Sequence, residues 1–336
     1  MRTVRHAKII GTGKYVPSNI ISSFDLDLKL DKPTGWVAQK SGVIERRFAT
    51  TETASFMGAE AAKQALEQAK ISIDDVDCII AANALKEQGI PANCIFILDK
   101  LNPTRHDITA LDIDSTCLSF ISAMNIASSM IELKIYRKIL IVSSEMPSLG
   151  LDWADMETCT IFGDGAAAVV LSVSESSEKE DSHVIACDFR THTEGKELCQ
   201  VLGLGTGQGR PFSDLTKIED DHNFKMQGKK VFKLASEKLP SFLDCFLDKA
   251  ECHKEDIHIV IPHQASGLGL LLVQQRLGFA DNKFMNIIAT HGNQVAASIP
   301  TALHEALRQN KIKRGDKVLL LGTGAGFAMG LLLFKY

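Results

Sequence analysis

Three polar residues that follow short apolar segments are of types that could carry out nucleophilic chemistry. Cys117 follows LDIDST, His263 follows IVIP, and Asn293 lies in THGNQVAAS. A cysteine at a helix N-terminus lies near the positive end of the helix dipole, which lowers the pKa of its thiol and favours the nucleophilic thiolate. The same backbone N–H groups could hold an oxyanion. We therefore take Cys117 as a candidate nucleophile, with His263 as a hydrogen-bond donor or proton carrier.

Each of these residues also has an ordinary structural interpretation. A single cysteine is more often part of the core, because free cysteine is among the most buried residue types. His263 alone is more often a satisfied structural histidine, and Asn293 alone is more often a helix cap. We assign the other cysteines to the core: Cys78, Cys94, Cys159, Cys187, Cys199, Cys245 and Cys252.

An internal repeat predicts the elements that position these residues. In the first half, helical and strand-like segments lead to LDIDSTC, then to the amphipathic segment LSFISAMNIASSMIEL and to KILIVSSE. In the second half, similar segments lead to MNIIATHGN, then to QVAASIPTALHEALRQ and KVLLLGTG. The alternation predicts parallel strands with helical crossovers in a layered α/β fold, and it makes Cys117 and Asn293 counterparts. We place the boundary in the polar run SESSEKEDS, between residues 1–175 and 176–336.

The overall composition excludes several classes of protein. The 336 residues carry a formal net charge of −4, which gives no basic field for nucleic acid or an anionic membrane. The sequence shows neither a leader of signal-peptide length nor a membrane-spanning apolar run, so we expect a cytoplasmic protein. The eight cysteines form no CxxC pair, which argues against a zinc site and a disulfide framework. The glycine motifs match no nucleotide-binding pattern, so we expect neither cofactor nor metal.

In their order within a duplicated unit, Cys117, His263 and Asn293 resemble the Cys-His-Asn set of the beta-ketoacyl-acyl-carrier-protein synthase III family. The resemblance extends over nearly the whole chain and includes IIGTGKYVP, GWVAQKSGVIERR, FGDGAAAVVL, MQGKKVFKLA, PHQAS, HGNQVAASIPTAL and GAGFAMG. It implies a thiolase-like fold, in which two βαβαβαββ halves form five layers in the order α-β-α-β-α.

The resemblance also implies a ping-pong decarboxylative Claisen condensation. Cys117 would take an acyl group from acyl-coenzyme A or acyl carrier protein, and a malonyl carrier protein would then lose carbon dioxide and attack it. His263 and Asn293 would hydrogen-bond the thioester oxygen, while the backbone N–H groups of Cys117 and Ala325 would form an oxyanion hole. No cofactor is implied, and the expected assembly is a homodimer.

Several substrate-binding positions depart from the family pattern. Trp36 matches a tryptophan near the nucleotide of coenzyme A. Lys40 and Leu268 stand where the family has arginines, and Ser266 stands where it has an asparagine. Lysine lacks the planar guanidinium that binds phosphate in a bidentate manner, so recognition of free coenzyme A is weakened. Ile90 stands where the family's segment lines the acyl pocket of the partner subunit. A basic segment matches the site where relatives bind carrier protein, although it fits a solvated helix face equally well: Lys225, Lys229, Lys230 and Lys233.

Three alternatives remain. The nearest is a family member of secondary metabolism, which transfers an acyl group to another acceptor or condenses two longer acyl chains. A papain-like cysteine protease has Cys, His and Asn in the same order, but the tryptophan expected just after the cysteine is absent and the repeat has no role there. A non-catalytic scaffold would be expected to have lost at least one of Cys117, His263 and Asn293.

Overall fold

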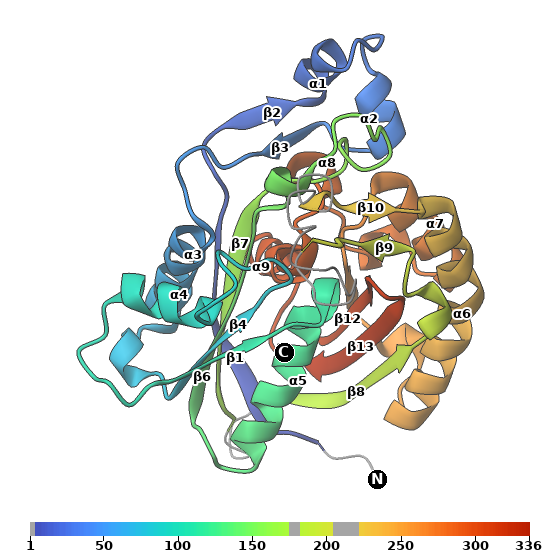
Figure 1. The fold of residues 1–336 in the computed structure, drawn as a ribbon. Helices are drawn as coiled ribbons and strands as arrows, with labels where there is room; N and C mark the ends of the chain where they lie inside the picture. The colour runs from blue at the N-terminus through green and yellow to red at the C-terminus, as the bar shows by residue number, and fades with distance from the viewer. Residues whose placement is uncertain (1–3, 175–181, 204–221) are drawn as a thin grey trace.

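The computed structural model describes residues 4–174, 182–203 and 222–336, and two β-sheets dominate them (Figure 1). The first sheet has the strand order β1-β7-β6-β4-β5. Within it, β4 pairs in parallel with β5 and β6, while β7 runs antiparallel to β1 and β6. Its strands are β1 (Ala7–Tyr15), β4 (Cys78–Ala82), β5 (Thr109–Ile113), β6 (Lys138–Glu145) and β7 (Gly165–Val173).

The second sheet repeats this plan with the order β11-β12-β13-β8. Strands β11 and β12 are parallel, and β13 runs antiparallel to β12 and β8. An isolated parallel bridge between Val260 and Phe284 occupies the place that β5 has in the first sheet. The strands are β8 (His183–Thr191), β11 (Ile259–Pro262), β12 (Lys317–Gly324) and β13 (Ala328–Lys335).

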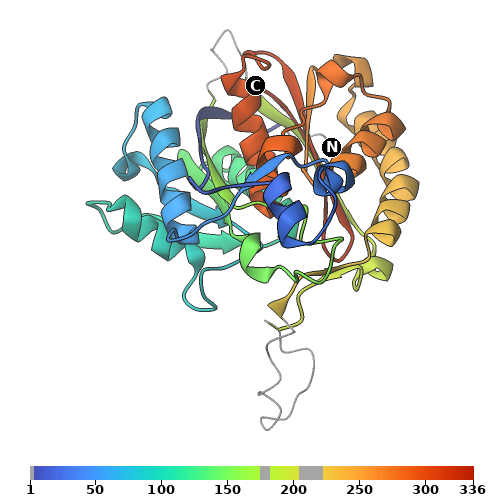
Figure 2. The ribbon, with the colours of Figure 1, turned by 90° about the horizontal axis from the view of Figure 1, so that it is seen from above.

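Helices lie between the two sheets and on both outer faces, which gives five layers (Figures 1 and 2). The central layer contains α5 (Ser119–Glu132) and α9 (Ser298–Arg308), whose apolar side chains pack with both sheets in one core cluster. The outer layers contain α3 (Ala54–Ala69) and α4 (Asn93–Leu101) on the first sheet, and α6 (Gly228–Ala250) and α7 (Gly267–Leu277) on the second. The predicted thiolase-like architecture is confirmed.

The apolar strands explain why the sheets lie inside the molecule. All five residues of β4, CIIAA, are buried, and seven of the eight residues of β6 are buried. Strands covered by helices on both faces need apolar side chains on both sides, so they read as continuous apolar runs. No helix among the described residues is both long and apolar enough to cross a membrane.

Shorter elements surround the open ends of the sheets. The remaining helices and strands are β2 (Ile20–Ser22), α1 (Ser23–Lys29), α2 (Trp36–Ser41), β3 (Glu45–Arg47), β9 (Cys199–Gln200), β10 (Lys225–Met226) and α8 (Ile288–His291). Two 3₁₀ turns, η2 (Thr116–Leu118) and η9 (Val295–Ala297), lead directly into α5 and α9. The boundary expected between residues 175 and 176 lies outside the described residues and stays a prediction.

Candidate active site

Two matching turns hold the residues singled out in the sequence. Turns η2 and η9 each begin with a β-branched residue in the left-handed region, Thr116 at φ 53° and Val295 at φ 50°. In each turn the N–H of this residue donates to a side-chain oxygen two positions earlier, Asp114 Oδ1 at 2.8 Å and Asn293 Oδ1 at 2.9 Å. β-Branched residues rarely adopt this conformation, and such strain is characteristic of functional sites.

The register of the two turns corrects one sequence-based prediction. Cys117 and Asn293 were expected to be counterparts, but the matching hydrogen bonds pair Asn293 with Asp114 and Cys117 with Ala296. The repeat therefore brings the two residues to equivalent turns at different positions. A comparison of strand and helix patterns does not resolve an offset of three residues within one turn.

Cys117 is the second residue of η2 and is partly exposed. Its own backbone N–H and that of Ala325 approach the sulfur and favour the thiolate, but burial outweighs them and raises the pKa of the thiol to about 12. The expectation that the helix N-terminus lowers this pKa was therefore wrong, because desolvation of the charged form dominates. The two N–H groups still converge on one point, as an oxyanion hole requires.

Glycines of β12 allow this close approach. A Cβ atom at Gly324 would lie 2.7 Å from Thr116 Oγ1, and one at Gly322 would lie 2.9 Å from a methyl group of Leu118. Because a Cβ atom at either position would force the facing side chain to shift, the glycines of KVLLLGTG let β12 lie close against η2. The turn that follows β12 carries Ala325.

His263 follows β11 and is almost fully buried, with 7% of its surface exposed. Burial lowers the pKa of the imidazole to about 4, so the ring is neutral at physiological pH. Its Nδ1 atom has no hydrogen-bond partner among the described residues. A neutral imidazole in a dry site can donate one hydrogen bond to a developing oxyanion without first having to lose a proton.

Asn293 is held by bonds to both sides of its amide. Its Oδ1 accepts from the N–H of Val295, and its Nδ2 donates to the carbonyl oxygen of Ala265 at 3.3 Å. Its backbone N–H donates to the carbonyl oxygen of Ile161 at 2.8 Å, which ties the turn to the strand-like segment before β7. The amide has two donors, and the bond to Ala265 uses one of them.

A cavity of about 1390 Å³ brings Cys117, His263, Asn293 and Ala325 together. Its walls are largely apolar and include side chains of α6, α7 and the loops after β4 and β6. An apolar wall lowers the local dielectric and so strengthens hydrogen bonds made to charge that develops inside. The described residues contain no group of three His, Cys, Asp or Glu side chains suited to a metal ion.

The expected substrate-binding residues divide into two groups. Lys40, Ser266, Leu268 and Lys229 line the cavity, and Ser266 also caps α7 by accepting from the N–H of Gly269 at 3.2 Å. Trp36 is not part of the lining, but the ammonium of Lys40 lies 5.3 Å from the centre of its ring. The described lining also omits four expected residues: Ile90, Lys225, Lys230 and Lys233.

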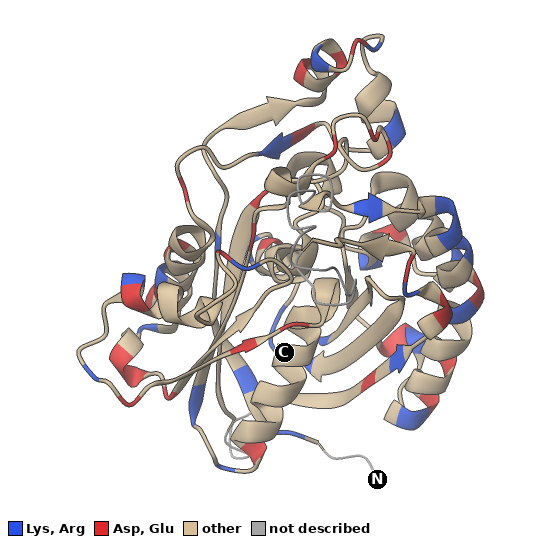
Figure 3. Cartoon of the chain, in the orientation of Figure 1, with Lys and Arg blue, Asp and Glu red and all other residues tan. Residues whose placement is uncertain are grey.

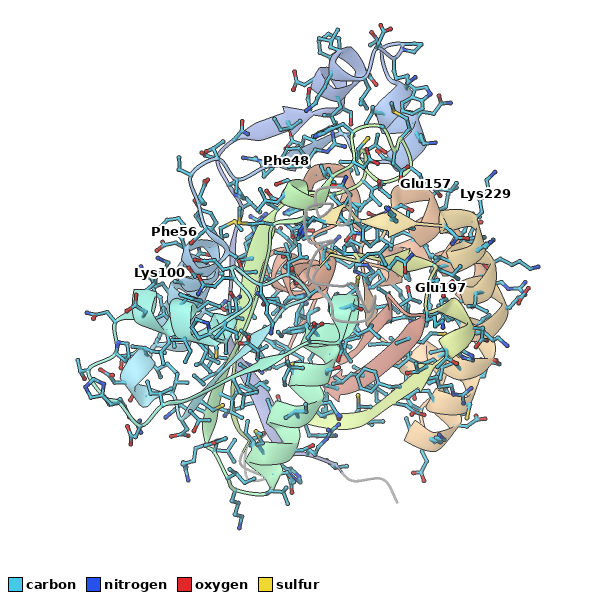
Figure 4. The ribbon with its side chains drawn as sticks, viewed as in Figure 1. Phe48, Phe56, Lys100, Glu157, Glu197 and Lys229 are labelled. Carbon is cyan, nitrogen blue, oxygen red and sulfur yellow. The ribbon has the colours of Figure 1, made fainter. Side chains whose placement is uncertain are left out.

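Four exposed lysines lie at or just before the start of α6, where Figure 3 shows blue segments along the helix: Lys225, Lys229, Lys230 and Lys233. In Figure 4, Lys229 and Glu157 lie on neighbouring segments, and both contribute to the cavity lining. Ile90 is 86% exposed, so within this chain it contacts no acyl pocket.

Sequence reasoning missed two titratable residues near the nucleophile. Cys199 of β9, assigned to the core, lines the cavity, and burial raises the pKa of its thiol to about 11. Glu145 ends β6 and is completely buried, and burial raises the pKa of its carboxyl to about 8. A carboxylate at the end of the apolar run KILIVSS was a signal that could have identified Glu145.

Known proteins are similar to this chain over nearly its whole length. The beta-ketoacyl-[acyl-carrier-protein] synthase III of Aquifex aeolicus is 34% identical over 329 residues, covering 98% of this chain and 99% of the relative. The enzyme of the same name from Natranaerobius thermophilus is 35% identical over 333 residues, covering 98% and 99%. The crystal structure of the A. aeolicus enzyme superposes with a TM-score of 0.87 at 33% identity, covering 98% of this chain and 100% of that one.

The fold and the site define an acyl-transferring condensing enzyme of the thiolase fold. The family model of 3-oxoacyl-[acyl-carrier-protein] synthase III matches residues 111–193. The model of the C-terminal part of the same family matches residues 247–336. The chain belongs to the 3-oxoacyl-[acyl-carrier-protein] synthase III family.

Proposed function

We propose that the condensation begins with transfer of an acyl group to Cys117. The sulfur attacks the carbonyl carbon of an acyl thioester, and the carbonyl oxygen becomes an oxyanion that the N–H groups of Cys117 and Ala325 stabilise. The carbon–sulfur bond to the donor then breaks, and the donor leaves as a thiol with the proton that Cys117 gives up. The product of this step is a thioester on Cys117.

In the second step a malonyl thioester binds beside the acylated cysteine. Its carbon–carbon bond to the carboxylate breaks, carbon dioxide leaves, and the electron pair forms an enolate. His263 and Asn293 donate hydrogen bonds to the enolate oxygen. The enolate carbon attacks the acyl carbon and the bond to Cys117 breaks. A 3-oxoacyl thioester is released, and the thiolate of Cys117 takes up a proton from solvent.

One observation carries this proposal. The N–H groups of Cys117 and Ala325 approach the sulfur of Cys117, in the same cavity that contains the neutral His263 and Asn293. Two sets of donors in one largely apolar cavity suit a reaction in which negative charge develops on two different thioester oxygens.

We favour a carrier protein over free coenzyme A as the acyl donor. Lys40 and Leu268 line the cavity where arginines are expected, so the described mouth lacks the guanidinium groups that would grip a nucleotide. The exposed face of α6 carries Lys229, Lys230 and Lys233, which suits an acidic protein. We place the enzyme in the cytoplasm and treat malonyl carrier protein as the second substrate.

A second candidate is condensation with a longer acyl chain. The apolar lining continues between two outer helices, with Phe232, Ala235 and Leu239 from α6 and Leu270 and Val273 from α7. Such a wall can bury several methylene groups, each worth about 0.8 kcal/mol.

We also propose a homodimer. Among the described strands only β4 pairs with β5, so the other edge of β5 is open at the end of the first sheet. An open edge of a central sheet invites pairing with a second copy. The exposure of Ile90 fits a position that reaches across such an interface.

Intact-protein mass spectrometry tests the proposed function. We expect a mass gain of one acyl group after incubation with acyl-carrier-protein or acyl-coenzyme A donors, and no gain for Cys117→Ala. Comparison of the donors identifies both the carrier and the chain length. A gain that persists in Cys117→Ala, or no gain with any donor, would contradict the assignment.

A further inference from the structure

Gln264 is a buried amide that stands between two residues of the cavity wall. Its neighbours His263 and Ala265 line the cavity, whereas Gln264 has no exposed surface and does not belong to the lining. It therefore does not touch a substrate directly. Burying an amide is costly unless its polar atoms find hydrogen-bond partners, so those partners indicate what the residue does.

Both polar atoms of the Gln264 side chain are paired with backbone groups. Nε2 donates to the carbonyl oxygens of Pro262 and Met285, at 2.9 and 3.1 Å, and Oε1 accepts from the N–H of Ile287 at 2.8 Å. Only an amide offers two donors and an acceptor in this arrangement. One side chain thus holds three backbone groups from two segments together.

These hydrogen bonds extend a strand pairing beyond the end of β11. The segment that contains Met285 lies beside β11, through the bridge between Val260 and Phe284. The N–H of Met285 donates to the carbonyl oxygen of Val260 at 2.9 Å. Strand β11 ends at Pro262, and the Gln264 amide supplies the next contacts between the two segments. It therefore fixes their separation where they approach the cavity wall.

Both segments lead to Asn293. Ile287 precedes α8, which is followed by Gly292 and Asn293. On the other segment, the carbonyl oxygen of Ala265 accepts from Nδ2 of Asn293 at 3.3 Å. Gln264 therefore constrains the amide of Asn293 from two sides, through the chain that carries it and through the carbonyl oxygen that it binds.

We propose that Gln264 is a positioning residue that holds the amide of Asn293 in the orientation required for decarboxylation. This inference rests on the proposed function. Gln264→Glu keeps the size of the side chain and an acceptor for the N–H of Ile287, but it loses both donors to the carbonyl oxygens. Gln264→Met keeps a similar length and removes all three hydrogen bonds. Either change releases the two segments from each other, so the amide of Asn293 loses its fixed orientation.

The decarboxylation of malonyl carrier protein by preformed acyl-enzyme measures this effect. We expect its rate to fall about tenfold or more in both variants, because small misplacements of catalytic groups have large effects on rate. Rates are normalised to the amount of acylated Cys117, so a misfolded fraction does not affect the comparison.

A second background distinguishes the positioning of Asn293 from a general loss of structure. Asn293→Ala removes the amide, so the substitutions at Gln264 have no amide left to orient, while His263 still offers one donor to the enolate oxygen. In this background we expect them to slow decarboxylation by less than about threefold, because residues that act as a unit have non-additive effects. A general loss of structure would instead reduce the rate by the same factor in both backgrounds.

Gln274 of α7 provides a matched control. Its Nε2 donates to the carbonyl oxygen of Phe279 at 3.2 Å and to Oδ1 of Asp281 at 2.7 Å, and none of these residues belongs to the cavity lining. Gln274→Met removes a similar pair of amide hydrogen bonds from the same half of the chain. This variant should decarboxylate malonyl carrier protein at the normal rate.

The outcomes separate this inference from the proposed function. Suppose that the unmodified enzyme forms acyl-Cys117 and releases carbon dioxide. The positioning role is then wrong if Gln264→Glu and Gln264→Met keep the normal rate, or if they lose as much rate in Asn293→Ala as in the unmodified background. If the unmodified enzyme forms no acyl-Cys117, the proposed function itself fails. A loss in both variants that disappears in Asn293→Ala supports the inference.

Discussion

At the scale of single residues, Cys117 is held mainly as the protonated thiol and not as the nucleophilic thiolate. Burial raises the pKa of the Cys117 thiol to about 12, although two backbone N–H groups favour the thiolate. The same N–H groups meet an oxyanion once substrate binds. A site designed for the transition state need not stabilise the thiolate of the free enzyme.

The reaction of Cys117 with iodoacetamide should report how much of its thiol is ionised. Only the thiolate reacts, so alkylation of the free enzyme should accelerate about tenfold per pH unit from pH 7 to 10 without a plateau. The sign follows from the pKa, because a thiol that titrates near 12 is still gaining thiolate throughout this range.

Peptide mass spectrometry distinguishes Cys117 from the other cysteines, and Cys117→Ala gives the background. A rate that levels off below pH 8 would show that the turn lowers the pKa instead. His263 is neutral from pH 7 to 10, because burial lowers the pKa of its imidazole to about 4. The ring therefore remains a hydrogen-bond donor throughout this pH range.

At the scale of elements, close packing of β12 against η2 sets the geometry of the oxyanion hole. Gly324→Ala would place a methyl group 2.7 Å from Thr116 Oγ1 and 3.3 Å from the carbonyl oxygen of Ser115. Because Thr116 precedes Cys117 and its side chain or the turn must shift to relieve this contact, we expect acylation of Cys117 to slow by about tenfold or more. Single-turnover acylation followed by mass spectrometry measures the change.

Gly89→Ala is the control for that experiment. A Cβ atom at Gly89 meets nothing within 4 Å, so this variant should acylate at the normal rate. Equal rates for Gly324→Ala and the unmodified enzyme would show that η2 tolerates the displacement.

The sequence predicts elements better than it predicts turns. Apolar runs such as CIIAA and the repeat of strands and helices predicted the layered fold, because these patterns arise from burial on both faces of a sheet. The repeat also brought Cys117 and Asn293 to the correct junctions. It gave the wrong register within the turns, because η2 and η9 are defined by left-handed residues and side-chain hydrogen bonds rather than by periodicity.

The hydrogen bonds of Glu145 lie beyond any pattern in the sequence. Its partners are the backbone N–H groups of Ala84 and Leu85, and backbone donors have no residue type to recognise. The raised pKa of Cys117 was missed for a related reason. Burial depends on the packing of distant segments, whereas the helix dipole could be inferred locally.

At the scale of the whole molecule, the edge of β5 should determine assembly. The N–H of Thr109 donates to Asp77 before β4, so the alternation of a strand directs the N–H of Ala110 to the open edge. Ala110→Pro removes that donor and spares the pairing with β4. We expect the unmodified protein to be a dimer in light scattering and the variant to be a monomer with unchanged far-ultraviolet circular dichroism.

A variant that remains dimeric would place the interface elsewhere. The monomeric variant also tests the role of Ile90. If this side chain shapes the partner's acyl pocket, loss of the dimer should alter the preference for acyl chain length.

The central layer has a consequence for how this enzyme can change. Helices α5 and α9 begin at Ser119 and Ser298, immediately after the turns that line the cavity, so both N-termini are directed toward the same small volume. Their combined positive potential comes from peptide groups rather than from side chains. Substitution scans will therefore leave part of the catalytic apparatus undetected. Side chains that face the substrate can be substituted to accept new acyl groups without changing the positive potential of the two helix N-termini. That potential, which favours anionic intermediates, is then retained.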